Sequence, residues 1–529
     1  MPTSSASRSF TGALATPHAL ATEAGMRAYR DGGTAIDAAV VAAAVLTVVY
    51  PHNVALGGDL IALVRTPDGD VRCVNASGWS GRGVDVDEVR RRCGDWLPIR
   101  GADTVTVPGG VRGWETLRTF GSRLGWAETL AAAEEVARTG VPVAPSLAGH
   151  LADPENADLF GLADFDGVFH PGGRPLAVGD VLTQPALAAT FAALGAAGPD
   201  AFYAGGLAAR SVDYLRVNGS VLDADDFAAF RPEIVDPLSA TFGALTVLTS
   251  PPNTHGFLLL RALRALDELG VADPLGRGLG RLMRIFHRGN ALRHERLADS
   301  RFTDVDVPTL LKDGLADVTA VGAAGTGHAP VARGDTVGIA AADDRGYAVS
   351  LIQSVYHAFG SGLIDPETGI LFHNRGTSFS LDAASPNVLA PRKRPAHTLM
   401  PVLTTEGGAV RHVLATMGGQ AQPQILAQVL LRALDGADAQ AAVSGPRAAV
   451  GVQIDGETAD SVTVEADVPA DAVDAVAAEG LLPWPVPVHT EALGQANVVF
   501  ADRSGALVAA SDPRADGAAS VTQFPRRDR

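Results

Sequence analysis

A threonine in the second half of the chain could serve as a catalytic nucleophile if it became a chain terminus. Thr336 opens the strand-like stretch "TVGIAAAD", and a Gly/Ala-rich run, "AVGAAGTGHAPVA" at residues 320–332, precedes it. An N-terminal threonine attacks a carbonyl with its hydroxyl and accepts the proton on its own α-amine. Such a residue must follow a segment that can be cut and must begin a rigid strand. The run at residues 320–332 predicts a mobile surface segment, so the stretch fits both conditions, although Asp-Thr before a strand is also an ordinary loop ending.

Other motifs lack the spacing that their chemistry needs. "GWSGR" has Arg82 where a nucleophile elbow has its closing glycine. "GRGLGR" has neither the spacing nor the preceding strand of a dinucleotide-binding loop. His287, His294 and Glu295 share a helical stretch, which favours a solvated or salt-bridged face over a metal site. Because a terminal threonine supplies nucleophile and base together, we expect no metal and no organic cofactor.

The composition is that of a globular enzyme-sized chain and argues against several partner classes. Of its 529 residues, 47% are hydrophobic, and the formal net charge is −17, which disfavours nucleic acid and anionic membranes as partners. Two cysteines, Cys73 and Cys93, suit a reducing compartment. The longest apolar run, residues 38–50, is too short to cross a bilayer and predicts a buried helix. No secretory apolar run occurs near the start, so we expect a soluble, cytoplasmic protein.

The elements that must position Thr336 alternate between helical and strand-like blocks. Residues 18–50 predict two helices around a Gly-Gly turn, and residues 60–76 predict a hairpin around Asp-Gly. Helical periodicity dominates residues 113–235. Strand-like pieces return after position 335, among them "YAVSLIQSV", "GILFHN", "MPVLTTEGGAVRHVLATMG" and "NVVFADRSGALVAASD". Antiparallel strands separated by helical blocks predict an α+β fold with helices stacked on the sheet faces.

The stretch that begins at Thr336 resembles the start of the small subunit in the γ-glutamyltransferase (γ-glutamyltranspeptidase) family of Ntn hydrolases. The similar stretch reads "DTVGIAAADDRGYAVSLIQSVYHAFGSGLIDPETGILFHNRGTSFSL". Near the other end, "GGTAIDAAVVAAAVLTVVYPHNVALGGD" is similar to a helix and Gly-Gly segment of that family. Further similar motifs follow in family order: "VPGGVRGW", "FYAGGLA", "SPPNTHG", "RPAHTLMP", "MGGQ" and "ASDPRADG".

The resemblance implies a fold and a precursor that cleaves itself. Cleavage would fall just before Thr336 and give a large subunit, 1–335, and a small subunit, 336–529, which together form one structural domain. The implied fold is the αββα sandwich, two stacked antiparallel sheets between helical layers. The two subunits would be each other's partners, and the resemblance leaves open a homo-oligomer of that heterodimer.

The resemblance also implies roles for individual residues. Thr336 would be the nucleophile, and Ser354 occupies the place of a hydroxyl residue that hydrogen-bonds the terminal threonine. Gly418 and Gly419 match paired glycines whose backbone N–H groups form an oxyanion hole. Glycine suits this role because two amides can approach the developing oxyanion without a Cβ in the way.

The similarity weakens at the residues that read the γ-glutamyl group in that family. Arg375 and Ser378 replace a glutamine and an aspartate that hold an α-amine, so the local charge is reversed. An arginine there would repel a cationic amine, and we expect a small-molecule acyl substrate with a carboxylate but no amine, anchored by Arg375 and assisted by His397. The other replacements are Ser77 for an arginine, Tyr356 for an asparagine, His397 and Thr398 for paired serines, and Val337-Gly338 for Thr-His.

Several interpretations remain open at this point. Two branches of the family fit such a site: one resembles oxamate amidohydrolases, and the other resembles hydrolases that cleave a C–C bond to an oxalyl-like side chain in natural-product pathways. An ordinary γ-glutamyl hydrolase or transferase with a rebuilt pocket, acting on glutathione-like substrates, is a third. An uncleaved, non-catalytic binding protein is a fourth. Arg375 could also be salt-bridged inside the fold rather than available to a substrate.

Overall fold

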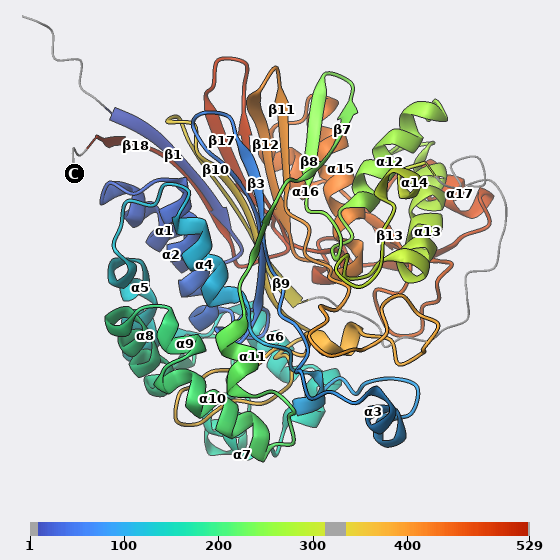
Figure 1. The fold of residues 1–529 in the computed structure, drawn as a ribbon. Coiled ribbons are helices and arrows are strands. Elements are labelled where there is room, and N and C mark those ends of the chain that lie inside the picture. Colours follow the sequence, from blue (N-terminus) through green and yellow to red (C-terminus); the bar gives the residue numbers. More distant parts are fainter. Residues whose placement is uncertain (1–8, 313–334, 527–529) are drawn as a thin grey trace, which may run out of the picture.

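The computed structural model describes residues 9–312 and 335–526. The run at residues 320–332, predicted to be a mobile surface segment ahead of Thr336, lies outside the described residues. Two sheets stand against each other in the centre of the molecule, and helices cover the outer face of each (Figure 1). The predicted sandwich of two stacked antiparallel sheets between helical layers is therefore confirmed.

The first sheet has the strand order β18-β1-β9-β10-β2-β3-β6, and every neighbouring pair is antiparallel. Strands from both parts of the chain lie in it: β1, β2, β3 and β6 precede position 335, whereas β9, β10 and β18 begin at or after it. Its strands are β1 (Ser9–Thr16), β2 (Asp59–Arg65), β3 (Val71–Ala76), β6 (Glu233–Val235), β9 (Asp335–Asp343), β10 (Ala348–Tyr356) and β18 (Ala518–Pro525).

The second sheet has the order β17-β16-β12-β11-β8-β7 and is also antiparallel throughout. Small and β-branched side chains fill the space between the two sheets, for example Ala340, Ala415 and Val413. The strands of the second sheet are β7 (Leu238–Phe242), β8 (Leu245–Thr249), β11 (Val402–Glu406), β12 (Ala409–Thr416), β16 (Ala496–Ala501) and β17 (Leu507–Ser511).

The helical layers bury their apolar faces on the outer sides of the sheets. The layer on the first sheet contains α1 (Ala19–Arg30), α2 (Ala35–Val49), α4 (Gly110–Arg118), α5 (Trp126–Thr139), α6 (Pro145–Ala152), α7 (Ala163–Phe169), α8 (Pro185–Ala197), α9 (Asp200–Tyr203), α10 (Gly206–Val217) and α11 (Ala224–Ala229). The layer on the second sheet contains α12 (Phe257–Glu268), α13 (Leu279–Arg296), α15 (Gln422–Leu434), α16 (Ala439–Ser444) and α17 (Ala470–Ala478). Short pieces complete the fold: α3 (Val86–Cys93), α14 (Val307–Leu310), and the small strands β4 (Val141–Pro142), β5 (Val181–Leu182), β13 (Ala448–Val450), β14 (Ser461–Glu465) and β15 (Leu482–Val486).

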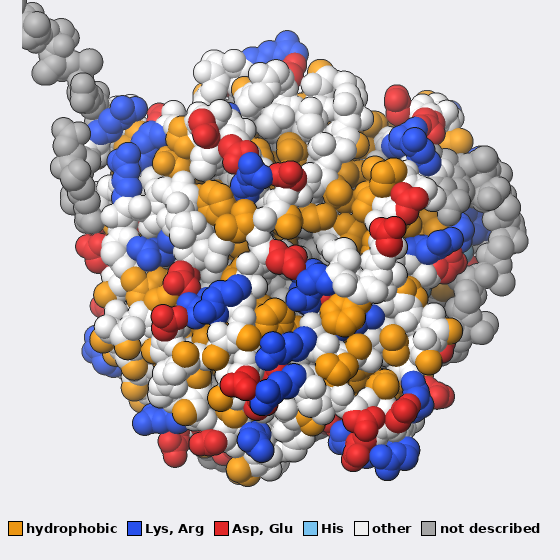
Figure 2. Space-filling model, viewed as in Figure 1, with side chains coloured by type: hydrophobic (Ala, Val, Ile, Leu, Met, Phe, Trp, Pro, Cys, Tyr) orange, Lys and Arg blue, Asp and Glu red, His pale blue; other side chains and the backbone are white. Residues whose placement is uncertain are grey.

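Helix α2 confirms the expectation for the long apolar run. All fifteen of its residues are buried, because it lies between the first sheet and the neighbouring helices α1 and α5. None of the helices in the described ranges is long and apolar enough to cross a membrane. On the face shown in Figure 2, acidic and basic side chains are interspersed rather than separated into areas of one sign.

One strand prediction was wrong. "GILFHN" forms no ladder, although its hydrophobic residues suggested a strand. Three consecutive amides bind three different segments: Phe372 binds the carbonyl of Leu363, His373 binds that of Gly57, and Asn374 binds that of Val355, at 3.0–3.1 Å. A ladder needs successive amides to meet one neighbouring strand, so this segment is a loop that ties together the surroundings of β9 and β10.

Strand β9 is the structural centre of the sandwich. It pairs with β1 on one side and β10 on the other, and all nine of its residues are buried. Its Gly338 faces the second sheet, where an added Cβ would lie 2.6 Å from the backbone nitrogen of Thr416. The backbone there cannot move aside easily, so the glycine at this position serves the close approach of the two sheets.

We expect Gly338→Ala to lower the free energy of unfolding by about 1–3 kcal/mol, the usual cost of overpacking a tight core. Urea denaturation followed by circular dichroism measures this change. Gly167→Ala is the matched control, because a Cβ at this helical glycine of α7 meets no atom within 4 Å. The control should be neutral or stabilising by at most about 1 kcal/mol. Equal stability of the two variants would contradict the close-packing explanation.

Candidate active site

Thr336 lies inside the first sheet at the beginning of β9. It is opposite Ser354 in the ladder with β10, and its side chain is fully buried. Its hydroxyl Oγ1 donates to Ser354 Oγ at 3.0 Å. The carbonyl of Thr336 accepts a hydrogen bond from Asn53 Nδ2 at 3.1 Å. The threonine predicted as the nucleophile and the serine predicted to bind it are thus in direct contact.

The hydroxyl of Ser354 also touches the peptide bond before Thr336. Ser354 Oγ donates to the carbonyl oxygen of Asp335 at 2.6 Å and accepts the backbone N–H of Tyr356 at 2.8 Å. Its single proton therefore polarises the Asp335 carbonyl, while its lone pairs accept from Thr336 and Tyr356. The serine thus holds the Thr336 hydroxyl next to the Asp335 carbonyl.

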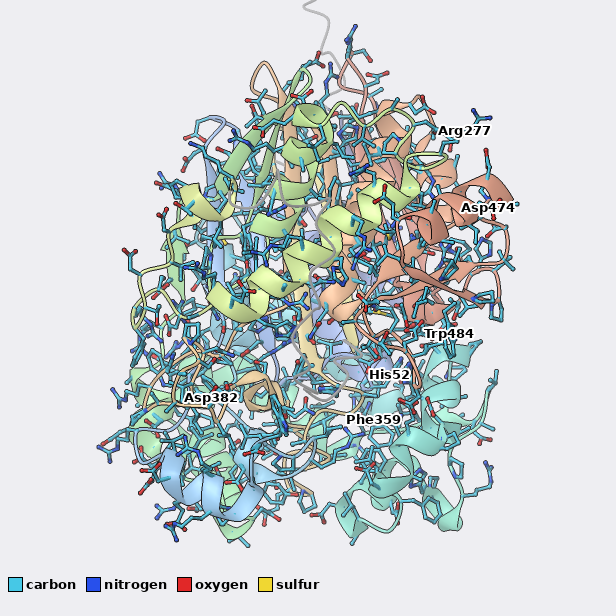
Figure 3. All side chains as sticks on the ribbon, turned by 90° about the vertical axis from the view of Figure 1, so that its right-hand side faces the viewer. His52, Arg277, Phe359, Asp382, Asp474 and Trp484 are labelled. Carbon is cyan, nitrogen blue, oxygen red and sulfur yellow. The ribbon has the colours of Figure 1, made fainter. Side chains whose placement is uncertain are left out.

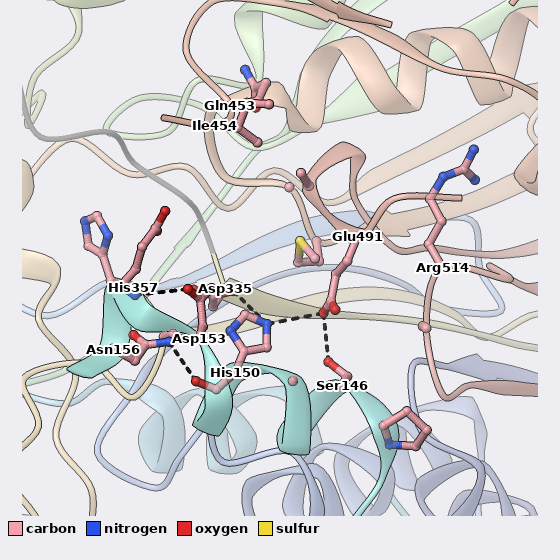
Figure 4. A pocket seen from close by; sticks show the side chains of 18 of the residues that line it. Ser146, His150, Asp153, Asn156, Asp335, His357, Gln453, Ile454, Glu491 and Arg514 are labelled. Atoms are coloured by element: carbon pink, nitrogen blue, oxygen red, sulfur yellow. Dashed lines mark hydrogen bonds and ion pairs between the residues drawn. The ribbon is translucent and has the colours of Figure 1, made fainter. Parts of the chain in front are cut away.

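A cavity of about 810 Å³ opens in front of this peptide bond (Figure 4). Asp335 and Gly418 both line it. Gly418 has a φ of 137°, and a Cβ there would lie 2.3 Å from Ile425 Cδ1, so only glycine fits. Among the described residues, no acceptor binds the N–H of Gly418 or Gly419. These amides precede α15, where a helix N-terminus favours negative charge, and they can serve an oxyanion.

A buried arginine comes directly after the loop that follows β10. Arg375 begins the short turn η5 (Arg375–Ser378) and has no exposed surface. Its guanidinium lies 3.8 Å over the ring of Tyr356, and its Nη1 donates to Thr398 Oγ1 at 3.2 Å. Its Nε and Nη2 have no hydrogen-bond partner in the described part of the chain. Two donors of a buried cation are therefore left for something else to bind.

No carboxylate of the described residues lies within ion-pair distance of Arg375, so the alternative of an internal salt bridge is not what the structure shows. Burial lowers the pKa of Arg375 to about 10, although Tyr356 and Asp59 counter part of that effect. The side chain is still charged near neutral pH. A buried positive charge without a counter-ion is costly, and an anionic ligand would remove that cost.

The carboxylate nearest to this cluster, Asp59, is committed to other groups. Asp59 Oδ1 accepts the backbone N–H groups of Gly78 and Gly109 at 3.1 Å each, and Oδ2 lies 3.2 Å from His397 Nε2. Burial raises the pKa of Asp59. The neighbouring His373, then His397, outweigh that effect and hold the pKa below its usual value.

His397 is neutral in this environment. Burial and the nearby Arg375 lower its pKa to about 3, so it carries one ring proton. That proton is on Nε2 and is donated to Asp59, because Nδ1 accepts the N–H of Leu399 at 3.3 Å. We expected His397 to assist in binding a substrate carboxylate. To do so, His397 would have to break its hydrogen bond to Asp59.

The remaining predicted substrate residues surround Arg375 without all facing the same space. Tyr356 and Thr398 touch its guanidinium directly. Ser378 Oγ bonds the carbonyl oxygens of Arg375 and Ala396 at 3.0 and 2.8 Å, so its hydroxyl fixes the turn that carries the arginine. The hydroxyl of Ser77 accepts a hydrogen bond from Asn253 Nδ2 at 3.1 Å.

Tyr356 has an unusual backbone for a bulky residue. Its φ is 82°, and the ladder between β9 and β10 shifts register between Ser354 and Tyr356. A non-glycine residue in the left-handed region costs free energy, and such residues are concentrated at functional sites. The irregularity turns the Tyr356 ring under the guanidinium of Arg375.

A second arginine near the site was not foreseen from the sequence. Arg293 of α13 is 7% exposed, and its guanidinium binds the side chain of Gln420, which directly follows the paired glycines. Its Nη1 also donates to Asn290 Oδ1 at 3.3 Å. Burial lowers the pKa of Arg293 to about 10, so it too remains charged. Basic residues are scattered along the sequence of α13, and no motif marks this one.

A polar network beside the cavity was also missed. His52, His150 and Glu491 each offer a possible ligand atom within 4.8 Å of one another, the spacing of a candidate metal site. Protein atoms already link them: Ser146 Oγ lies 2.9 Å from His52 Nε2 and 2.8 Å from Glu491 Oε1. Figure 3 shows His52 and Phe359 inside the molecule, whereas Arg277 and Asp474 are at its edge. His287, which we expected on a salt-bridged face, pairs with Asp460 at 2.7 Å.

Comparisons with known proteins match this chain to members of one family. A family model described as gamma-glutamyltranspeptidase matches residues 21–522. The glutathione hydrolase-like YwrD proenzyme of Bacillus subtilis (strain 168) is 35% identical over 517 residues, covering 96% of this chain and 97% of that protein. The oxamate amidohydrolase proenzyme of Klebsiella pneumoniae is 35% identical over 525 residues, covering 96% and 98%.

Solved structures show the same similarity in three dimensions. The crystal structure of cephalosporin acylase from Bacillus halodurans matches with a TM-score of 0.88 and 30% identity, covering 98% of this chain and 97% of that one. The match extends over both sheets and both helical layers. Two relatives from the sequence comparison carry the word proenzyme in their names, so they are made as precursors.

Proposed function

Because the chain belongs to the gamma-glutamyltranspeptidase family of Ntn hydrolases, we propose that it cleaves itself before Thr336 and then hydrolyses small acyl substrates that carry a carboxylate. Its relatives are named hydrolases and acylases, and the chain is an enzyme of this type. The observation that carries the substrate class is the buried guanidinium of Arg375 with two unpartnered nitrogens.

The contacts around the Asp335–Thr336 bond support self-cleavage. Thr336 Oγ1 would attack the carbonyl carbon of Asp335, whose oxygen Ser354 polarises. The hydroxyl proton passes to the departing nitrogen as the C–N bond breaks, which leaves an ester between the two residues. Water then hydrolyses the ester. The products are the new carboxylate of Asp335 and the free α-amine of Thr336, and thus the large subunit 1–335 and the small subunit 336–529.

The released threonine would then supply both nucleophile and base. Its α-amine takes the hydroxyl proton while Oγ1 attacks the substrate carbonyl, and the N–H groups of Gly418 and Gly419 hold the oxyanion. The amine returns the proton to the leaving group, which departs and leaves an acyl ester on Thr336. Water, activated by the same amine, releases the acid. Because one residue provides both functions, this reaction calls for no cofactor.

Arg375 would select the acyl group. Its unpartnered Nε and Nη2 match the fork geometry that binds a carboxylate with two hydrogen bonds. A γ-glutamyl group also has a carboxylate, but its α-amine would stand near Arg375 and Arg293, two buried cations. The Klebsiella relative is named for oxamate, an amide whose acyl group carries a carboxylate and no α-amine.

The experiment is a substrate comparison with matched pairs. We expect the cleaved enzyme to hydrolyse oxamate-like amides at least about 10²-fold faster in kcat/KM than the same amides with the carboxylate replaced by a carboxamide, as expected for losing a charged, buried contact. A chromogenic γ-glutamyl anilide should be a poor substrate. Faster turnover of the γ-glutamyl anilide would overturn the proposed specificity and favour the γ-glutamyl alternative.

A ketone in the same panel separates hydrolysis of amides from hydrolysis of C–C bonds. An α-keto acid with an oxalyl-like group presents the same carboxylate to Arg375 and the same kind of carbonyl to Thr336. Turnover of the ketone but not of the amide would assign the C–C branch. If the folded protein cleaves neither itself nor any of these compounds, the binding-protein alternative replaces the enzyme.

A further inference from the structure

The side chain of Asp335, the residue just before the proposed cleavage site, makes an ion pair in the cavity (Figure 4). Its carboxyl group is only 9% exposed, and Oδ1 lies 3.8 Å from His150 Nε2. The backbone of the same residue is also fixed, because Ser354 donates to its carbonyl. Asp335 is therefore held both at its side chain and at the carbonyl oxygen of the peptide bond that Thr336 would attack.

His150 is in turn held in place by groups from another part of the chain. Its Nε2 lies 3.5 Å from Glu491 Oε1, at the start of η7 (Glu491–Leu493). The same oxygen accepts from Ser146 Oγ at 2.8 Å and from Gln495 Nε2 at 2.7 Å. With Oε1 fixed in this way, Glu491 keeps the imidazole of His150 directed at Asp335.

The electrostatics keep this pair charged around neutral pH. Burial lowers the pKa of His150, but Asp335 and then Glu491 more than offset this and raise it to about 9. Burial raises the pKa of Asp335 to about 6, against the opposing effect of His150. Between these values an imidazolium faces a carboxylate. The charged groups that act on Asp335 are His150, Glu491 and Arg100.

We propose that His150 is a positioning residue for self-cleavage, which holds the Asp335 carboxylate so that the Asp335 carbonyl stays in line with the Thr336 hydroxyl. The inference rests on the proposed function, because it concerns the same bond. His150 touches no reacting atom. Without it the carboxylate would keep the backbone N–H of Ala358 but lose its cationic partner, and the carbonyl would keep its bond to Ser354.

The physical reason is the sensitivity of attack to geometry. A displacement of about 1 Å between nucleophile and carbonyl can cost about 10²-fold in rate. A free Asp335 side chain would also stand close to Glu491, and two carboxylates that share a buried site repel each other. The imidazolium between them removes that repulsion in the precursor.

The test is the self-cleavage rate of the full chain, followed by intact mass after purification at low temperature. We expect His150→Gln and Asp335→Asn each to slow cleavage by about 10- to 100-fold. The double variant should be no slower than the slower single variant, because both remove one interaction. His489→Gln is the matched control, because His489 lines the same cavity and its ring contacts the carbonyl of Ser444 rather than Asp335. This variant should cleave itself at the wild-type rate.

A pH profile separates positioning from a general loss of structure. The wild-type rate should fall below about pH 6, where Asp335 gains a proton and the pair is lost, whereas Asp335→Asn should show no such fall. A His150→Gln chain that splits as fast as the wild type, or a double variant slowed by the product of the two single effects, would overturn this inference alone. A folded wild type that never splits would overturn the proposed function with it.

Discussion

Alanine at position 336 is expected to leave the chain whole and to abolish hydrolysis of acyl substrates. The variant lacks the Thr336 hydroxyl, which Ser354 holds beside the Asp335 carbonyl, so neither the ester intermediate nor the free α-amine can form. Removing a nucleophile that acts together with its base usually costs about 10⁴- to 10⁶-fold in kcat. Intact mass measures the first effect, and a turnover assay with an oxamate-like amide measures the second.

Thr336→Ser is the matched control for this prediction. Serine keeps the hydroxyl and, after cleavage, the α-amine, so it should split at the same bond and retain measurable turnover. It lacks the methyl group that restricts rotation of the threonine side chain, and we expect slower cleavage for that reason. An alanine variant that splits at the wild-type position would show that Thr336 Oγ1 is not the attacking atom.

Arg375→Gln is expected to lower kcat/KM for carboxylated acyl substrates by about 10²- to 10³-fold, mostly through KM. The change removes a buried charge and the two free donors Nε and Nη2 that we assign to the substrate carboxylate. The same substrate with a carboxamide in place of the carboxylate should be turned over by the variant about as well as by the wild type. Steady-state kinetics with the two substrates measures both effects.

Stability distinguishes this role from a structural one. Arg375 is a buried cation without an ion-pair partner in the described residues, and replacing an uncompensated buried charge by a neutral side chain usually does not destabilise a fold. We therefore expect the melting temperature of Arg375→Gln to equal or exceed that of the wild type. Arg375→Lys keeps the charge but loses the fork, and should have intermediate activity. A large loss of stability in Arg375→Gln, with unchanged substrate preference, would show a structural role.

Local patterns predicted the elements around the site well. The apolar run of α2 indicated a helix buried on all sides, and the Asp-Gly turn indicated the hairpin of β2 and β3, because both signals depend on neighbouring residues. The same holds for β9, whose sequence indicated a rigid strand that begins near Thr336. The loop at residues 369–374 was mistaken for a strand because its hydrogen-bond partners come from three distant segments.

The site itself was only partly accessible from the sequence. Thr336, Ser354 and Arg375 stood out because family motifs surround them, and the structure brings them to adjoining positions on β9, β10 and η5. His150 and Glu491 lie far apart in the sequence, and neither belongs to a motif. They become neighbours only because α6 packs against η7.

Gly338, which differs from the residue of the family motif at this position, shows that such a difference need not concern the chemistry of the site. Its place directly after Thr336-Val337 suggested a change at the active site. In the structure its missing side chain leaves room for the backbone of Thr416, and Asn497 Nδ2 binds its carbonyl at 3.0 Å. The glycine is explained by the spacing of the two sheets, a constraint that no local pattern reveals.

The most direct test of self-cleavage is the intact mass of the purified, folded wild type, with the N-terminal residue of the smaller piece identified. We predict two pieces, the smaller one beginning at Thr336, with masses that add up to the full chain plus one water. A single folded species at the full 54.3 kDa, or a smaller piece that begins at any other residue, would contradict the account of Thr336 as the nucleophile.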